Sequence, residues 1–209
     1  ALNADKVYNE SHLKGVYFQA VKDITNIVQT TGNSKYTLTE LTVDSSDTYC
    51  NNATVLAAWS MVVVYEDPSI TQLNTINLYE GFKKSSNSSF DYTLDGIKVS
   101  EKPVAKYSVL AWEGDESLGT DGEYLKFNGT DLSDQDNPDN NLFNSSINSI
   151  GKGIDTTYGV DFDTFDVSTN VKEGQTSITG TVGTGQDLVF QGAALVMVTD
   201  DLAGQKQVD

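Results

Sequence analysis

The longest apolar run of the chain lies in the stretch WSMVVVYEDP, residues 59–68. A strand with one solvated face alternates apolar and polar residues, whereas Val62, Val63 and Val64 are consecutive. The branched side chain of valine favours an extended backbone. Pro68 would end the strand because proline lacks a backbone N–H. The pattern therefore predicts a strand over 55–66 that is covered on both faces, at the centre of a β-rich domain.

A second long apolar run, DLVFQGAALVMVTD, covers residues 187–200 and predicts a strand paired beside 55–66. The stretch 176–183 reads as an edge strand, because it is polar and interrupted by glycine. Apolar residues at helical spacing within 21–28 predict one helix, which Gly32 and Asn33 would end. Alternating stretches predict further strands at 16–20, 36–43, 74–82, 91–99, 106–114, 123–129 and 161–168.

About ten short strands with one helix favour an all-β fold, a β-sandwich or a jelly roll. No internal repeat or linker divides the sequence, so we predict a single domain over 1–209 with a core spanning about 7–200. Trp59–Glu66 and Leu188–Val198 are expected in that core. The acidic segment 113–141 is predicted to form a large loop, and 142–150 a short helical turn or strand.

The charge balance narrows the possible partners. The chain carries 13 basic residues, all of them lysine, against 30 acidic ones, and its formal net charge is −17. This balance argues against nucleic acid and anionic membranes as partners, because both attract clustered Lys and Arg. No apolar run approaches the roughly 20 residues that span a bilayer. Cys50 is the only cysteine, so no disulfide forms within the chain.

Several motifs together resemble a domain of unknown function that recurs in large secreted and surface-anchored proteins of bacteria and archaea. They are W-S-x-V-V-V-Y-E-D-P (59–68), L-Y-x-G-F (78–82), A-W-E-G-D (111–115), N-P-x-N-N-x-F-N-S-S-I (137–147) and G-V-D-F-D-T-F-D-V-S (159–168). The resemblance implies an extracellular β-domain within a long multidomain protein, and the chain also begins as an internal fragment would. It carries over no catalytic residue. Similar sequences have an Arg after E-D-P, where this chain has Leu73-Asn74.

The acidic loop DLSDQDNPDNN suggests a cation site. Calcium takes six to eight oxygen ligands, which loops of Asp and Asn supply, so Asp134, Asp136 and Asp139 are the candidate ligands. The spacing does not match the EF-hand pattern. The alternative is that these residues form turns, because Asp and Asn side chains bond to their own backbone.

Acidic residues within 113–166 also suggest a secreted hydrolase acting on polysaccharide. Asp161 and Asp163 share one strand face, and a pair of carboxyl groups cleaves glycosidic bonds. Charges opposite Phe162 are, however, typical of the solvated side of an amphipathic strand. Other acids of this region are Glu113, Asp115, Glu116, Asp121 and Glu123.

Trp112 and Tyr124 flank the acidic loop, as aromatic residues do when they stack on sugars, although Trp112 also fits a core position. We therefore expect a non-catalytic structural or adhesive module at the cell surface, calcium-stabilised and in contact with a glycan, a cell or neighbouring domains of the same protein. The hydrolase and a spacer without a ligand are the alternatives.

Overall fold

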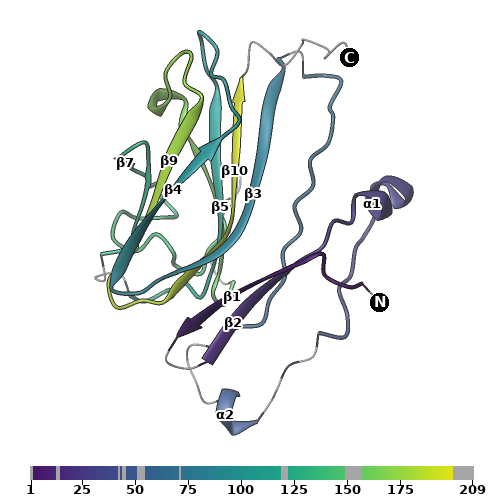
Figure 1. The fold of residues 1–209 in the computed structure, drawn as a ribbon, viewed down its shortest axis with the longest axis vertical. Coiled ribbons are helices and arrows are strands. Elements are labelled where there is room, and N and C mark those ends of the chain that lie inside the picture. The colour runs from purple at the N-terminus through teal and green to yellow at the C-terminus, as the bar shows by residue number, and fades with distance from the viewer. Residues whose placement is uncertain are drawn as a thin grey trace. The chain divides into compact units, whose positions relative to one another are not determined.

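The computed structural model describes residues 2–12, 15–41, 43, 46–50, 55–70, 72–118, 122–148 and 157–199, with position 50 described in its backbone alone. The chain divides into two compact units, 1–63 and 64–209. Among the described residues, no helix is long and apolar enough to cross a membrane. The helices and strands of Figure 1 are, in order, β1 (Lys6–His12), β2 (Gly15–Val21), α1 (Thr25–Thr31), α2 (Asp47–Cys50), β3 (Asn74–Ser85), β4 (Ser88–Asp95), β5 (Ala105–Trp112), β6 (Tyr124–Phe127), β7 (Thr130–Asp131), β8 (Val160–Asp166), the 3₁₀ turn η1 (Ser168–Asn170), β9 (Ser177–Thr184) and β10 (Val189–Thr199).

The first unit holds an antiparallel hairpin and two short helices. Strands β1 and β2 pair along their full length, from Lys6 opposite Val21 to His12 opposite Gly15. The predicted strand at 16–20 is thus confirmed as β2. The predicted helix is also present, but it begins at Thr25 because Val21 belongs to β2. The described residues of the predicted strand 36–43 form no strand.

The second unit is a β-sandwich. Its two four-stranded antiparallel sheets have the strand orders β3-β10-β5-β8 and β4-β9-β6-β7, and they form the two layers of Figure 1. The all-β sandwich class is therefore confirmed, with every sandwich strand lying between residues 74 and 199. Whether 1–209 behaves as one domain stays a prediction.

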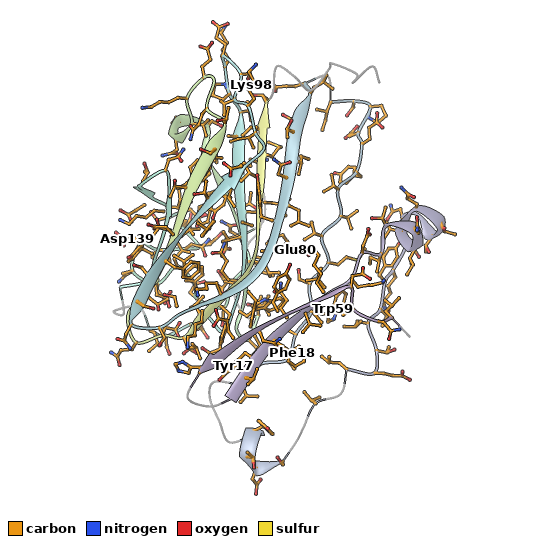
Figure 2. All side chains as sticks on the ribbon, in the orientation of Figure 1. Tyr17, Phe18, Trp59, Glu80, Lys98 and Asp139 are labelled. Carbon is orange, nitrogen blue, oxygen red and sulfur yellow. The ribbon has the colours of Figure 1, made fainter. Side chains whose placement is uncertain are left out.

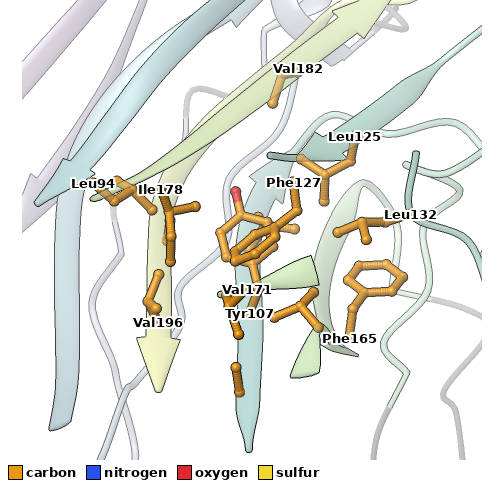
Figure 3. Packing of buried hydrophobic residues seen from close by; sticks show 14 of the residues in the cluster. Leu94, Tyr107, Leu125, Phe127, Leu132, Phe165, Val171, Ile178, Val182 and Val196 are labelled. Atoms are coloured by element: carbon orange, nitrogen blue, oxygen red, sulfur yellow. The ribbon is translucent and has the colours of Figure 1, made fainter. Parts of the chain in front are cut away.

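Apolar side chains that alternate along the strands meet between the two sheets. The rings of Tyr107 in β5 and Phe127 in β6 lie 5.1 Å apart between centroids, and both side chains are fully buried. Leu125, Phe165 and Val196 belong to the same buried cluster, which Figure 3 shows from close by. The core thus draws on both sheets, as burial of one face of each sheet requires.

The prediction of a central, doubly covered strand at 55–66 is wrong. Residues 55–67 form no helix or strand, and Trp59, Val64 and Tyr65 are 48%, 58% and 78% exposed. Both edges of β10 pair instead with β3 and β5. An apolar run shows strand propensity, but the partner of a strand depends on pairings distant in sequence. The other predicted core segment, Leu188–Val198, is confirmed in β10.

Strand β9, which was expected at an edge, is central and pairs with both β4 and β6. Its glycines leave room for aromatic rings of the neighbouring strands. A Cβ on Gly180 would lie 2.3 Å from Tyr92 Cζ, and a Cβ on Gly183 would lie 2.2 Å from Tyr124 Cζ. Glycine in this strand therefore marks cross-strand packing rather than an open edge.

The other predicted strands of the sandwich are present, with ends shifted by a few residues. Residues 113–148 form a long connection that holds only the short strands β6 and β7. The described part of the predicted turn or strand at 142–150 is irregular apart from a bridge at Ile147, and 149–150 lie outside the described residues.

Candidate functional site

Five acidic side chains are buried at one end of the sandwich, which we call the acidic end. Because β5 runs antiparallel to β8 and β10, its last residue, Trp112, lies opposite Val160 and Phe190 at the starts of those strands. The start of β6 lies beside the end of β9 in the other sheet, with Tyr124 opposite Gly183. These strand ends bring together Glu113, Glu123, Asp161, Asp163 and Asp187, none of which is more than 7% exposed.

Three of these carboxylates hold the loop that follows β7. Glu123 Oε2 accepts the backbone N–H of Phe143 at 2.9 Å, and Asp161 Oδ1 accepts that of Ser146 at 3.1 Å. Asp163 Oδ1 accepts the backbone N–H of Asn148 at 2.9 Å. A buried loop needs partners for its backbone donors, and here acidic side chains take the place of a neighbouring strand.

Burial raises the pKa of these acids. It raises the pKa of Asp163 to about 7 and that of Glu113 to about 8, the latter with further help from the charges of Asp187 and Asp115. The pKa of Glu123 rises to about 10, because of burial and a hydrogen bond with Asp187. Burial and the charge of Asp163 raise the pKa of Asp161 well above its usual value. Burial therefore favours the neutral form of these four carboxyl groups.

The placement of Asp161 and Asp163 on a solvated strand face is wrong. Both side chains are fully buried, and Phe162 faces the other side of β8. Asp166, at the end of the strand, is exposed and accepts hydrogen bonds from Ser168. Asp121 lies outside the described residues. The remaining acids of the region, Asp115 and Glu116, are exposed.

The predicted calcium ligands lie in the same loop, and all three residues are exposed. Asp134 Oδ1 accepts the backbone N–H groups of Asp136 and Asn137, at 2.9 and 2.8 Å. Its Oδ2 accepts Asn148 Nδ2 at 2.6 Å. Asp136 and Asp139 are exposed, and Asp139 lies at the periphery of the sandwich unit in Figure 2.

These contacts of Asp134 match the turn role that the sequence left open. Among the described residues, no group of three or more His, Cys, Asp or Glu side chains is arranged to hold a metal ion. Calcium at Asp134, Asp136 and Asp139 stays a prediction.

The two aromatic residues proposed for ligand binding are not brought together. Trp112 alternates with the buried Ala111 of β5, and Tyr124 alternates with the buried Leu125 of β6. Since these strands belong to opposite sheets, the two side chains lie on opposite outer faces of the sandwich. Both are half-buried, and Lys126 Nζ lies 4.9 Å from the centre of the Tyr124 ring. One sugar cannot stack on both.

A shallow hollow of about 400 Å³ lies elsewhere on the sandwich and is lined by Asn128, Thr130, Thr169, Asn170, Lys172 and Gln175. Two of its three amides already have partners. Asn128 Nδ2 donates to the Asn170 carbonyl, and Asn128 Oδ1 accepts the backbone N–H of Thr179. Gln175 likewise bonds to backbone groups through both side-chain atoms. The side-chain amides of Asn128 and Gln175 are therefore already hydrogen-bonded within the sandwich.

Sequence reasoning missed Asp187 and Asn148. Asp187 precedes an apolar strand, where an acid usually marks a solvated turn, yet it is 3% exposed. Asn148 is also buried, and its Oδ1 accepts the backbone N–H of Thr164 at 2.6 Å. No local pattern distinguishes either residue from the many exposed Asp and Asn of this chain. The side chain of Cys50 lies outside the described atoms.

Comparison of the chain with protein-family models gives no match, and comparison with curated proteins gives no significant one. The resemblance to a recurring extracellular domain therefore stays a prediction.

Proposed function

We propose that this chain is a non-catalytic module of a large secreted or cell-surface protein, with a structural or adhesive role. One observation carries the proposal. The acids that would serve a hydrolase are buried and hold a loop by its backbone. Asp161 and Asp163 are 0% exposed, and each accepts a backbone N–H of residues 146–148. These groups support the fold rather than face a substrate.

Glycoside hydrolysis needs two carboxyl groups that flank the scissile bond, with access for the sugar and for water. In this chain, Ser146 and Asn148 occupy the positions next to Asp161 and Asp163. A polysaccharide would have to displace this loop to reach either carboxyl group. Displacement would leave the backbone donors of the loop and the two buried acids without their hydrogen bonds, which is costly.

The surface charge favours particular contacts. With a net charge of −17 and no Arg, the module suits a neutral glycan or a neighbouring domain of the same protein. It suits nucleic acid and anionic membranes poorly, since both repel an acidic surface. An extracellular location agrees with the sequence resemblance, and cell fractionation with an antibody against the chain tests it. Detection only in the cytoplasm would contradict this part of the proposal.

The functional test measures binding and cleavage on the same polysaccharides. The full chain is applied to a glycan array and, separately, to soluble polysaccharides in which new reducing ends are measured. We expect no release of reducing ends. Release that Asp163→Asn abolishes and the surface change Glu173→Gln preserves would establish a hydrolase and overturn the proposal. Binding without cleavage would support the adhesive role, and the absence of both would support the structural role alone.

A further inference from the structure

The outer face of the sheet β4-β9-β6-β7 carries an aromatic ring that lies flat on β9. Tyr124 of β6 stands opposite Gly183 of β9. A Cβ on Gly183 would lie 2.2 Å from Cζ, 2.4 Å from Cε1 and 2.5 Å from the hydroxyl oxygen of Tyr124. Because these distances to three bonded atoms are nearly equal, the Cβ position lies over the face of the ring and not at its edge. One face of the Tyr124 ring therefore packs on the glycine, and the other turns away from the sheet.

A row of hydrogen-bonding side chains crosses the same face. Thr181 of β9 is opposite Asp91 of β4 on one side and Lys126 of β6 on the other. Thr181 Oγ1 donates to Asp91 Oδ1 at 2.7 Å. At the other end of the row, Lys126 Nζ lies 3.0 Å from Oδ1 of Asp131 in β7. Two positions separate Lys126 from Tyr124, so the row lies about 7 Å along the strands from the aromatic ring.

The groups of this row can still bond to a ligand. Asp91 and Asp131 are exposed, and each carboxylate has a second oxygen that accepts hydrogen bonds. Lys126 Nζ has three donors and lies 4.9 Å from the centre of the Tyr124 ring. Because the lysine stem is flexible, a ligand that stacks on the ring displaces the ammonium group only to its own edge. The ring thus has acceptors and a donor beside it.

This arrangement suits a neutral pyranose sugar. Such a sugar presents C–H groups on one face, which pack on an aromatic ring, and hydroxyl groups around its edge, which donate and accept hydrogen bonds. Lys126 is the only basic residue in the four strands of the sheet, and it is already paired with Asp131. A uronate or a sulfated sugar would therefore meet negative charge that is not balanced.

We propose that Tyr124, Asp91, Lys126 and Asp131 form a binding surface for neutral glycans on the outer face of the sheet β4-β9-β6-β7. Tyr124 stacks on the C–H face of one sugar, and the row bonds to the hydroxyl groups of that sugar or of the next one. Trp112 takes no part, because it belongs to the other sheet. This proposal rests on the adhesive form of the proposed function and names the surface that would carry it.

The test measures how far the full chain is retarded in native gels that contain a soluble β-glucan, xylan or galactomannan, and in gels that contain polygalacturonate. We expect at least one of the three neutral polysaccharides to retard the wild-type chain and polygalacturonate not to. Tyr124→Leu keeps an apolar cover on Gly183 but removes the flat ring. It should weaken binding by about tenfold or more, as truncation of a central aromatic contact does. Tyr158→Leu is the control, since Tyr158 is 86% exposed and lies just before β8 of the other sheet.

A folded Tyr124→Leu that binds as tightly as wild type would overturn this surface and leave adhesion through another part of the module in place. A wild-type chain that none of the three neutral polysaccharides retards, or that only polygalacturonate retards, would overturn the surface together with adhesion to neutral glycans. If Tyr124→Leu does not fold, the wild-type chain gives the answer. Amide NMR signals of 124–126 and 181–183 should shift when an oligosaccharide of the bound polysaccharide is added. Shifts confined to other parts of the chain would refute the proposal.

Discussion

Replacing Asp163 with Asn should change how the stability of the chain depends on pH. Burial raises the pKa of Asp163 from 3.8 to about 7. A group with a raised pKa contributes stability below its unfolded pKa and loses that contribution as pH rises through the folded value. A shift of about 3 units corresponds to about 4 kcal/mol, lost between about pH 4 and 7. Asn cannot ionise, so Asp163→Asn should not undergo this loss.

The substitution also has a cost that does not depend on pH. Asp163 Oδ1 accepts the Asn148 N–H, and Asp163 Oδ2 is buried without a hydrogen-bond partner among the described residues. An Asn at 163 places an amide NH₂ in this buried site, and an unsatisfied buried donor costs about 1–3 kcal/mol. The variant should therefore be less stable than wild type near pH 4, and at least as stable at about pH 8.

Urea unfolding of both chains at constant ionic strength, from about pH 4 to 8, measures the effect. The quantity to compare is the difference in unfolding free energy, which should change by about 4 kcal/mol in favour of Asp163→Asn over this range. Asp166→Asn is the control that should show no such change over this range, because hydrogen bonds from Ser168 lower the pKa of Asp166 from 3.8 and its contribution is lost only below about pH 4. Parallel stability curves for wild type and Asp163→Asn would refute the reasoning that Asp163 is held in a protonated, buried state.

Three further predictions test the packing and the cation site. Gly180→Ala should destabilise the chain by about 1–3 kcal/mol, because the added Cβ would lie 2.3 Å from the Tyr92 ring. Gly81→Ala is the control, since a Cβ there meets nothing within 4 Å. Equal urea midpoints for the two variants would contradict the contact at Gly180. Tyr65→Ser should change the free energy of unfolding by less than about 0.5 kcal/mol, because the Tyr65 side chain is 78% exposed. Phe127→Ala should lower it by about 3–5 kcal/mol, because Phe127 is fully buried. A large loss of stability in Tyr65→Ser would support the central strand predicted at 55–66. Excess chelator should lower the melting temperature and added calcium should restore it, as the predicted cation site requires, and an unchanged transition would remove calcium from the acidic loop.

Much of the sandwich follows from local patterns because its strands alternate. Strands β3, β5 and β10 carry apolar residues at a period of two or in a continuous run, and each was expected close to its observed position. The stretch 55–66 carries an equally strong signal but forms no strand. Propensity shows which segments suit a pleated conformation, whereas pairing distant in sequence decides which of them join a sheet.

The acidic end was harder to predict because strand β8 fits two opposite registers. Phe162 and Phe165 are an odd number of positions apart, so they must lie on opposite faces of the strand. With Phe162 inside, Asp161 and Asp163 would be solvated; with Phe165 inside, both acids are buried. In the structure Phe165 is 5% exposed and opposite Tyr107, a core residue of β5.

The choice of register links the fold to the proposed role of the acids. Burying two carboxyl groups is unfavourable, and it is tolerated where they are protonated or hydrogen-bonded. The backbone N–H groups of Ser146 and Asn148 satisfy one oxygen of each acid, while Asp161 Oδ2 and Asp163 Oδ2 are buried without a hydrogen-bond partner among the described residues. Because the loop supplies these donors from a segment without a strand pattern, the sequence alone could not reveal the pairing. The same mutual dependence accounts for the burial of two acids whose spacing in the sequence also fits a catalytic pair.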